Sequence, residues 1–335
     1  METPSPDGNE AAGAAVDVRG ERGSIQDLPD RTESGPASAN GSDLPFVSVV
    51  IPVWADQERL ESCLEALKGQ DYPAERMEVI VVDNGSGDEP ARLGARFPQI
   101  RFVEEGTPGS YKARNRGIQL ARGEILAFTD SDCIPAADWI ASGVRRLSEM
   151  SRIGFLAGSV VVAPRVTADP SLAELYEIVL AFPQAEYVRQ AHFGATCNLF
   201  TTAGVFREVG VFDDRLYSAG DIEWGRRVFA SGRQMVYAQD VRVTHRARAS
   251  VAELIQRARR VAAGALLLEQ DRPARVLSDQ LLFLFPRPRL VWKILTSRQT
   301  DDPWKRALLL GLHLMLRQVK FWERVRIMLG GQPLR

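Results

Sequence analysis

The sequence is poor in cysteine. Cys63, Cys133 and Cys197 are the only three in 335 residues, and no two of them form a CxxC pair. This spacing argues against a disulfide framework and against a zinc site. A few scattered cysteines fit a reducing cytosolic compartment. We interpret all three as packing residues, because a buried free cysteine behaves as a small apolar side chain.

Long apolar runs are also missing. The first ten residues, METPSPDGNE, contain neither a basic nor an apolar stretch, so no secretory signal is expected. The best membrane candidate, residues 307–316, is ten residues long and includes a histidine. A bilayer-spanning helix needs about 20 apolar residues. We therefore expect a cytoplasmic protein.

Glycine-rich phosphate-binding motifs are absent as well. No GxGxxG follows a predicted strand, which excludes a dinucleotide-binding dehydrogenase. The first strand continues into VIPVWADQ (50–57), which contains no glycine. A nucleotidyltransferase-like enzyme, which also uses paired aspartates and a metal, would need a glycine-rich loop there. That function is kept as a disfavoured alternative.

The net charge of -1 conceals an uneven distribution. Residues 246–335 carry 18 basic and 7 acidic side chains, a net of +11, and the rest of the chain is acidic. A cationic end indicates an anionic partner, either a membrane surface or a polyanionic substrate, and no nucleic acid is expected. Residues 307–329 interleave leucines and aromatics with Arg and Lys, as in a helix lying on the inner face of the plasma membrane. The alternative is a helix that packs on the catalytic domain with its arginines facing water.

The chain divides into three segments by composition. Residues 1–44 are rich in Gly, Ser, Ala, Pro and Asp and predict a disordered tail. Residues 45–250 alternate short β-branched runs with helical patterns, and residues 251–335 are helical and basic. The expected strands are 46–53, 77–83, 100–105, 124–130 and 154–164, with 235–245 as a strand pair. The expected helices are 56–69, 89–97, 111–121, 136–150, 171–181 and 222–231.

This alternation predicts an α/β domain with a mostly parallel sheet, in which ligands bind at the carboxyl ends of the strands. Asp83 and Asp130 both stand at such ends. Asp130-Ser131-Asp132 places two carboxylates on one turn, and hard oxygen ligands suit Mg²⁺ or Mn²⁺. A divalent cation held there would neutralise a diphosphate. Taken alone, a D-x-D turn is equally well explained as a solvated turn or a helix cap.

Three blocks, in order, resemble the family 2 glycosyltransferases. They are VSVVIPV (47–53) with VIVVDNGS (79–86), GSYKARNRGIQLARGEILAFTDSDC (109–133) and GVFDDRLYSAGDIEWGRRVFASG (210–232). The resemblance covers about residues 46–250. It implies the GT-A fold, a Rossmann-like, mostly parallel sheet flanked by helices, here with a helical C-terminal extension. It also implies an inverting sugar transfer from a nucleotide-diphosphate sugar, most often a UDP-sugar, to a glycolipid or polysaccharide hydroxyl.

The resemblance also implies roles for individual residues. Binding of the nucleotide sugar is implied for Pro52, Val53, Trp54, Asp83, Lys112, Arg114, Asn115, Asp130 and Ser131. Metal binding is implied for Asp132, Asp130 and His245, and the general base by position is Asp221. The sequence departs from the family's E-D pair, because Gly220 replaces the glutamate, so Glu223 stays open as the base.

Structural explanations compete with several of these roles. Asp83 could cap its loop, and Asp221 could cap a helix. Lys112 and Arg114 could belong to the wet face of a helix, and His245 could be a hydrogen-bonded core residue. Trp224 could stack on a sugar or fill the core, and His192 and Asn198 could contact substrate. The loss of the glutamate at Gly220 also leaves open a non-catalytic nucleotide- or carbohydrate-binding homologue.

Overall fold

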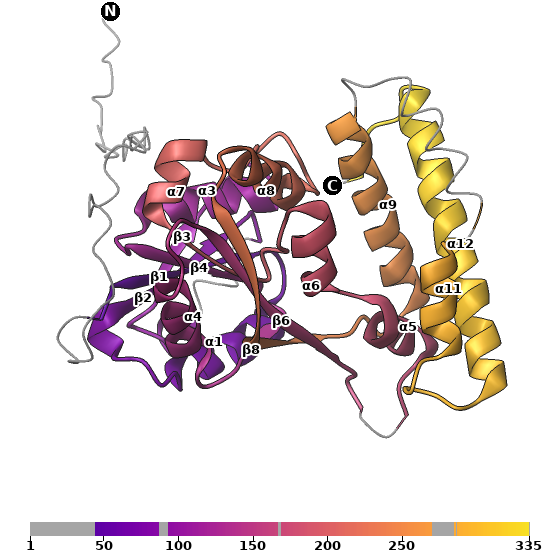
Figure 1. Cartoon of the computed structure of the whole chain (residues 1–335), viewed down its shortest axis with the longest axis horizontal. Helices are drawn as coiled ribbons and strands as arrows, with labels where there is room; N and C mark the ends of the chain where they lie inside the picture. Colours follow the sequence, from indigo (N-terminus) through magenta and orange to yellow (C-terminus); the bar gives the residue numbers. More distant parts are fainter. Residues whose placement is uncertain (1–43, 87–92, 167–168, 270–284, 286, 335) are drawn as a thin grey trace, which may run out of the picture.

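The structure, a computed structural model, describes residues 44–86, 93–166, 169–269, 285 and 287–334. The predicted N-terminal tail lies outside these residues except for Leu44, and the predicted helix at 89–97 lies partly outside them. The described chain builds one sheet with helices on both faces, and further helices stand side by side at one end (Figure 1).

Eight strands form the sheet in the order β3-β2-β1-β4-β7-β6-β8-β5. Their bounds are β1 Val47–Val53, β2 Met77–Asp83, β3 Arg101–Glu104, β4 Ile125–Thr129, β5 Cys133–Pro135, β6 Ile153–Ala163, β7 Asn198–Thr202 and β8 Gln234–Arg246. The pairs β1–β2, β1–β4, β2–β3 and β6–β8 are parallel, whereas β7 and β5 run against their neighbours. Six strands therefore share one direction, and the mostly parallel sheet predicted from the sequence is confirmed.

The helices of the described chain cover both faces of this sheet and its end. They are α1 Gln57–Lys68, α3 Ser110–Leu120, α4 Trp139–Ser148, α5 Leu172–Leu180, α6 Gln184–Glu186, α7 Ala203–Val209, α8 Gly220–Ala230, α9 Val251–Glu269, α11 Pro288–Leu295 and α12 Pro303–Met328, with a 3-10 turn η2 at Ala74–Arg76 and a π-helical turn η3 at Tyr187–Ala191. Apolar residues of α1 and α4 cover one face, and those of α3, α7 and α8 cover the other. Because both faces are buried, β1 is an almost entirely apolar run, interrupted by the buried Ser48.

Two short strands and one long one differ from the sequence prediction. β5 and β7, three and five residues long, were not predicted, since runs this short carry little periodic signal. The predicted strand pair at 235–245 is wrong, because this segment is one strand, β8. Its register against β6 shifts between Gly158 and Ser159, whose partners are Ala238 and Arg242, so three residues of β8 bulge out there. A bulge of this kind breaks the alternation and imitates a turn.

Asn198 joins the strands around this bulge and is fully buried. Its side-chain amide donates to the carbonyl oxygens of Ser159 (2.9 Å) and Val241 (3.0 Å). Its side-chain oxygen accepts from the indole nitrogen of Trp139 (2.9 Å). Both polar ends of Asn198 are therefore used inside the protein, so this residue holds β6, β8 and α4 together.

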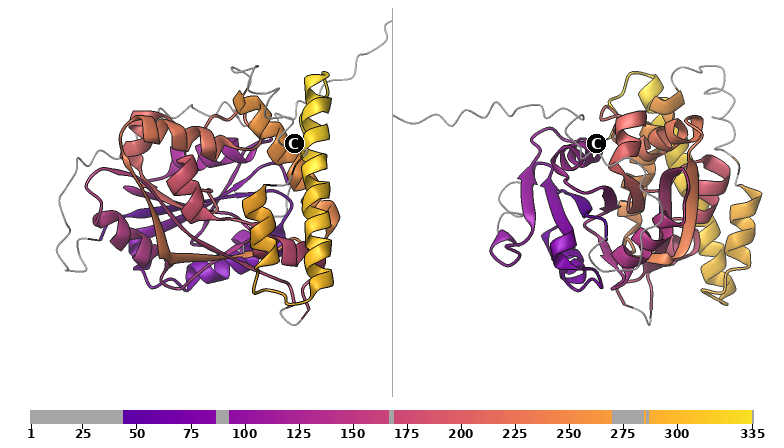
Figure 2. Two further views of the ribbon diagram at one scale, coloured as in Figure 1. Left: turned by 45° about the vertical axis from the view of Figure 1, so that its right-hand side comes forward. Right: turned by 60° about the vertical axis from the view of Figure 1, so that its left-hand side comes forward.

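The C-terminal helices pack against the sheet domain through α5. Leu312 and Leu316 of α12 lie with Leu254 and Ala258 of α9 and with Ala173 of α5. Figure 2 shows α12 as the outermost element on this side of the molecule. Packing of this segment on the rest of the chain, one of the two alternatives from the sequence, is thus observed for one side of α12. Within the described residues, no helix has the length and apolar content needed to span a membrane.

The role of Asn198 leads to a stability prediction. Replacing Asn198 with alanine removes three hydrogen bonds and leaves two carbonyls and an indole N–H unpaired, so we expect the free energy of unfolding to fall by about 3 kcal/mol. Urea unfolding followed by circular dichroism measures this change. Gln119→Ala, at an exposed position of α3, should cost less than about 0.5 kcal/mol. A similarly small effect of Asn198→Ala would contradict the role assigned to Asn198.

Candidate functional site

The parallel alignment of β1, β2 and β4 brings three polar turns to one edge of the sheet. Asp83 ends β2, Asp130 follows β4, and Trp54 follows β1. Pro52 and Val53 lie inside β1 with their side chains buried, whereas Trp54 keeps 69% of its surface exposed. The ring of Trp54 is thus free to contact a ligand above this edge. The sequence-predicted residues at the strand ends therefore come together in the fold.

Asp83 stabilises the turn that follows β2. Both of its carboxylate oxygens accept the backbone N–H of Ser86 at 3.1 Å, and the Ser86 hydroxyl accepts the N–H of Ala55 at 2.6 Å. The turn after β2 is thereby tied to the turn after β1. Asp83 caps its own loop, which was one of the two interpretations of the sequence. This cap holds its carboxylate at the predicted nucleotide-binding edge.

The D-x-D turn directs its two carboxylates to different partners. Asp130 forms an ion pair with the guanidinium of Arg114, while Asp132 Oδ2 lies 3.1 Å from Nε2 of His245. Ser131, between them, is buried. The short strand β5 brings Asp132 to His245, because it pairs with β8 in the register Cys133↔His245. His245 is buried, with its ring centroid 4.7 Å from that of Phe182.

Asp132 is strongly acidic. Burial alone would raise the pKa of this carboxyl, but its interactions with His245, Arg248 and Arg59 outweigh burial and hold the pKa well below its ordinary value. Arg59 Nη1 lies 3.9 Å from Asp132 Oδ2. Asp132 is therefore a carboxylate at any physiological pH, which a metal ligand must be.

The residues at this turn have the chemistry of a divalent-cation site. Two carboxylates and one imidazole are donors that Mn²⁺ accepts, and the carboxylates suit Mg²⁺. The Nδ1 atom of His245 is buried without a hydrogen-bond partner in the described chain, so the ring is held mainly by its contacts to Asp132 and Phe182. Within the described residues, no group of three or more His, Cys, Asp or Glu side chains lies close enough together to hold a metal ion by itself. The turn could therefore supply part of a coordination shell, with oxygens of a ligand supplying the rest.

Helix α3 supplies the cationic side of the site. The helix approaches β1 closely because residue 117 is glycine, and a Cβ there would lie 2.3 Å from a methyl group of Val50. Arg114 is buried under the site, so it belongs to the interior and not to the wet face of the helix. Lys112, one residue after Tyr111, is half-buried.

Asn115 has a structural contact on the far side of the same helix. Its amide donates to the carbonyl oxygen of Phe212 (2.8 Å), and its side-chain oxygen accepts the N–H of Phe212 (3.1 Å). Both polar groups thus hold the loop that leads to α8. A role in nucleotide binding stays a prediction for this residue.

Asp221 lies in the first turn of α8, which begins two residues before its predicted start. The N-cap position is Ala219, so Asp221 is not the helix cap. Burial raises the pKa of Asp221 above its ordinary value, although a hydrogen bond from Tyr111 and the charge of Arg114 act against it. A carboxyl with a raised pKa at this edge is suited to accept a proton.

Glu223, the other candidate base, is bound by an arginine. Its two carboxylate oxygens lie 2.7 and 2.8 Å from the guanidinium nitrogens of Arg227. Arg227 also donates to the carbonyl oxygens of Val209 and Val211. Glu223 therefore anchors α8 to the preceding loop. Trp224 is fully buried, with its indole N–H on Gly210, so it fills the core and does not face a sugar.

Sequence reasoning missed several residues around the site. Tyr111 contacts Asp221, and Arg257 of α9 lies over the Phe182 ring, 5.3 Å from its centroid. Gly264, two turns further along α9, packs so tightly that a Cβ would lie 2.4 Å from the carbonyl oxygen of Ser218. The GSYKARN motif, which contains Tyr111, is the sequence signal that could have indicated this residue. The helical pattern after residue 250 does not indicate that α9 reaches the site.

Arg260 lies between these two contacts on α9. The pKa of Arg260 is lowered, first by loss of hydration and then by Arg248 and Arg257, while Asp130 and Tyr111 act in the opposite direction. Its side chain is still exposed, and no carboxylate of the described chain pairs with it. A cation near Asp130 is thus left available to an anionic ligand.

Backbone strain occurs at four positions in the described chain, and three of them adjoin the site. Among the described residues, four that are not glycine have a left-handed φ, namely Ala55 (48°), Phe182 (48°), His192 (56°) and Ala219 (67°). Ala55 follows Trp54, Phe182 contacts His245, and Ala219 precedes Gly220 and Asp221. His192 stacks on Phe229 at 3.8 Å between ring centroids. Such strain is typical of functional sites.

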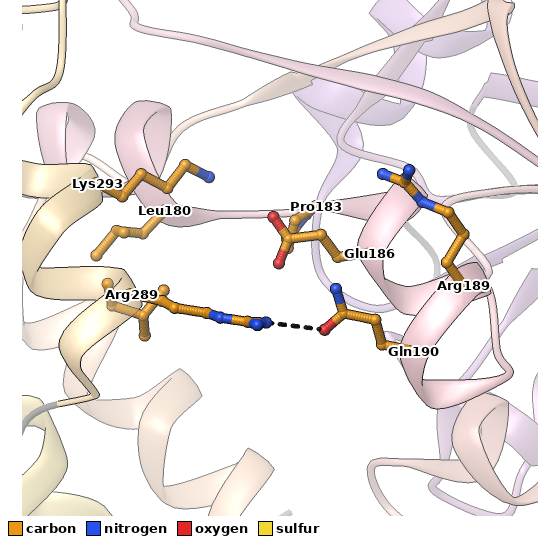
Figure 3. A pocket seen from close by; sticks show the side chains of 8 residues that line it. Leu180, Pro183, Glu186, Arg189, Gln190, Arg289 and Lys293 are labelled. Atoms are coloured by element: carbon orange, nitrogen blue, oxygen red, sulfur yellow. Dashed lines mark hydrogen bonds between the residues drawn. The ribbon is translucent and has the colours of Figure 1, made fainter.

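A separate pocket lies on the outer side of α6 and η3, against α11. It has a volume of about 460 Å³, and Figure 3 shows the cations Arg189, Arg289 and Lys293 around it with Glu186. Arg289 donates to the Gln190 side-chain oxygen at 3.4 Å. None of the predicted site residues lines this pocket.

Comparison with solved structures supports the fold. A mannosyltransferase from Pyrobaculum calidifontis, solved in complex with GDP-Man and Mn²⁺, superposes with a TM-score of 0.57 at 18% identity, over 88% of this chain and 90% of that one. TarS 1-349 from S. aureus superposes with a TM-score of 0.51 at 15% identity, over 86% and 75% of the two chains.

Sequence comparison supports the family. Residues 48–210 match the model of "Glycosyl transferase family 2". The chain is 35% identical to glycosyltransferase AglE of Haloferax volcanii over 258 residues. The aligned region covers 74% of this chain and 84% of AglE. The chain is also 21% identical over 225 residues, 63% of this chain and 70% of the other, to the dolichyl N-acetyl-alpha-D-glucosaminyl phosphate 3-beta-D-2,3-diacetamido-2,3-dideoxy-beta-D-glucuronosyltransferase of Methanococcus voltae. With the strand-end carboxylates and the fold described above, these matches show that the chain is a glycosyltransferase and belongs to glycosyl transferase family 2.

Proposed function

We propose that this glycosyltransferase uses a nucleotide-diphosphate sugar, a divalent cation and Asp221 as its general base, with inversion at the anomeric carbon. The observation that carries the proposal is the separation of carboxylates into two environments. Asp132 is held strongly acidic beside His245, whereas Asp221 has a raised pKa beside Tyr111. An ionised ligand and a proton acceptor are the two tasks that such a reaction divides between carboxylates.

Different residues at the sheet edge would bind different parts of the donor. Asp83 and the exposed Trp54 would contact the nucleotide, and Lys112 and Arg114 would lie beneath the diphosphate. Asp130, Asp132 and His245 would hold Mg²⁺ or Mn²⁺, which when bound neutralises charge on the diphosphate. Arg260 would add a positive charge on the same group. The P. calidifontis mannosyltransferase was solved with Mn²⁺, which supports the use of a divalent metal.

Asp221 would accept the proton of the acceptor hydroxyl while that oxygen attacks the anomeric carbon opposite the leaving nucleotide. This step needs a carboxylate that is separate from the metal ligands, since it acts on the other face of the sugar. The ion pair between Glu223 and Arg227 makes Glu223 a less suitable base. The non-catalytic alternative is disfavoured because the residue in place of the family's glutamate, Gly220, still leaves Asp221 at the site.

Substitution of the carboxylates tests the assignment. Purified protein should release nucleotide from one member of a panel of UDP-, GDP- and dTDP-sugars with Mn²⁺ or Mg²⁺, and a chelator should stop the release. Asp132→Ala and Asp221→Asn should each lower kcat by about 100-fold or more. Glu223→Gln serves as the matched control and should keep most of the activity. Full activity of Asp221→Asn together with loss of activity in Glu223→Gln would mean that Glu223, and not Asp221, is the base.

The raised pKa of Asp221 predicts the pH dependence. A base works only when deprotonated, so the rate should fall as the pH drops through the raised pKa of Asp221. The acid limb of kcat/KM should therefore lie above about pH 4, the ordinary value for an aspartate. A pH–rate profile of nucleotide release measures the limb. A limb at or below that value would mean that another group is the base.

We further propose that residues 251–335 place the enzyme on an anionic membrane surface at the cytoplasmic side, where it meets a glycolipid acceptor. The side of α12 that faces away from α9 carries a stripe of exposed apolar residues, and the pocket beside α11 is lined by cations. The stripe comprises Trp304, Leu308, Met315 and Trp322 of α12 and the residue just after its end, Leu329. Its spacing by four and seven residues keeps it on one face of the helix. The net charge of +11 after residue 245 complements anionic headgroups.

Vesicle sedimentation tests the membrane surface. The wild type should bind vesicles that contain phosphatidylglycerol and bind pure phosphatidylcholine weakly. Trp304→Glu with Trp322→Glu should lower the affinity by about tenfold or more, because two Trp side chains that are 78% and 64% exposed would no longer enter the interface. Val161→Glu, at an exposed apolar position of β6, should bind like the wild type. Unchanged vesicle binding by the double variant would contradict the membrane role. A wild type that is a stable dimer, together with a double variant that is a monomer, would contradict it as well.

A further inference from the structure

The hydroxyl group of Tyr111 clamps Asp221 at two points. Tyr111 Oη donates to Asp221 Oδ1 at 3.1 Å and accepts the backbone N–H of Asp221, also at 3.1 Å. The N–H of Ile222 donates to the same Oδ1 at 3.0 Å. Among the described residues no hydrogen bond reaches Oδ2. One carboxylate oxygen is therefore held and the other is left for a ligand.

Gly220 is needed for this clamp. A Cβ at residue 220 would lie 2.8 to 2.9 Å from three carbon atoms of the Tyr111 ring, which is closer than packed atoms come. The ring is buried between α3 and α8 and cannot move away easily. The glutamate that the family has before the aspartate would therefore not fit beside Tyr111. The loss of that glutamate and the presence of Tyr111 belong to one local arrangement.

The same tyrosine is joined to the metal side of the site. The guanidinium of Arg114 lies 5.4 Å from the centroid of the Tyr111 ring and pairs with Asp130. A continuous series of contacts thus runs from Asp130 through Arg114 and Tyr111 to Asp221. This series fixes the separation of the two ends of the site.

We propose that Tyr111 is a positioning residue that holds Oδ1 of Asp221, so that Oδ2 faces the acceptor hydroxyl. The proposal rests on the proposed role of Asp221 as the base. In the step itself the hydroxyl proton passes to Oδ2, and the hydroxyl oxygen bonds to the anomeric carbon. The bond from that carbon to the diphosphate oxygen breaks, and its electron pair leaves with the nucleotide diphosphate. Tyr111 keeps its own proton throughout.

Kinetics of Tyr111→Phe test the proposal. Without the hydroxyl, kcat for sugar transfer should fall by about tenfold, a part of the effect of losing the base itself, while KM for the donor stays unchanged. The acid limb of the pH–rate profile should move to higher pH, because the hydrogen bond from Tyr111 favours the ionised carboxyl. The other groups that act on Asp221, namely Arg114, Asp130, Tyr187 and Cys197, remain in the variant.

Tyr72→Phe is the matched control. It removes another buried tyrosine hydroxyl, which donates to the Pro45 carbonyl oxygen at the other end of β1, and it should leave both kcat and the acid limb unchanged. A Tyr111→Phe enzyme with the wild-type kcat and acid limb would overturn the proposal.

A second measurement needs no activity and separates the two hypotheses. Urea midpoints are compared for wild type, Tyr111→Phe, Asp221→Ala and the double variant. If Tyr111 holds Asp221, the shifts of the two single variants will not add up to that of the double variant. Additive shifts would overturn the clamp. Non-additive shifts with full activity of Asp221→Asn would keep the clamp and refute Asp221 as the base.

Discussion

The buried guanidinium of Arg114 is the charge around which the site is arranged. A buried cation is tolerated only when a carboxylate and further polar groups compensate for its lost hydration. Asp130 supplies the carboxylate and the Tyr111 ring supplies an electron-rich face. Because α3 lies so close to β1 at Gly117, neither partner can be far from the end of β4. The D-x-D turn and the start of α8 are thereby held at a fixed distance before any substrate binds.

The same arrangement explains why the carboxylates differ in acidity. Asp132 contacts the imidazole of His245, and this contact, together with the charges of Arg248 and Arg59, favours its ionised form. In the described chain the carboxyl of Asp221 has a neutral hydroxyl and one backbone N–H as hydrogen-bond partners, and burial outweighs these and the charge of Arg114. The site thus holds carboxyl groups in two different environments, and this difference is the basis of the two roles proposed for them.

Much of the sheet could be predicted from the sequence, because its buried strands are continuous β-branched runs that end in polar turns. Asp83, Asp130 and Asp132 follow from that pattern and from the resemblance to the family. β5 and β7 are too short for a periodic signal, yet β5 sets the pairing of Asp132 with His245. The clamp on Asp221 could not be predicted, since Tyr111 and Gly220 are distant in sequence and only packing shows their dependence. Asn198 likewise resembles a site residue in sequence but is bonded entirely within the interior.

Helix α12 is apolar on two sides, and this has a practical consequence for protein engineering. Its inner side covers Leu254, Ala258 and Ala173, whereas its outer side exposes tryptophans. Truncating the chain before α12, a common way to obtain well-behaved protein, would remove the outer side only by uncovering the inner one. Such a shortened protein would expose a different apolar surface in place of the first one. It would also leave α9, which carries Arg260, without the helix that packs against it. Solubility is better sought by changing side chains on the outer face than by shortening the chain.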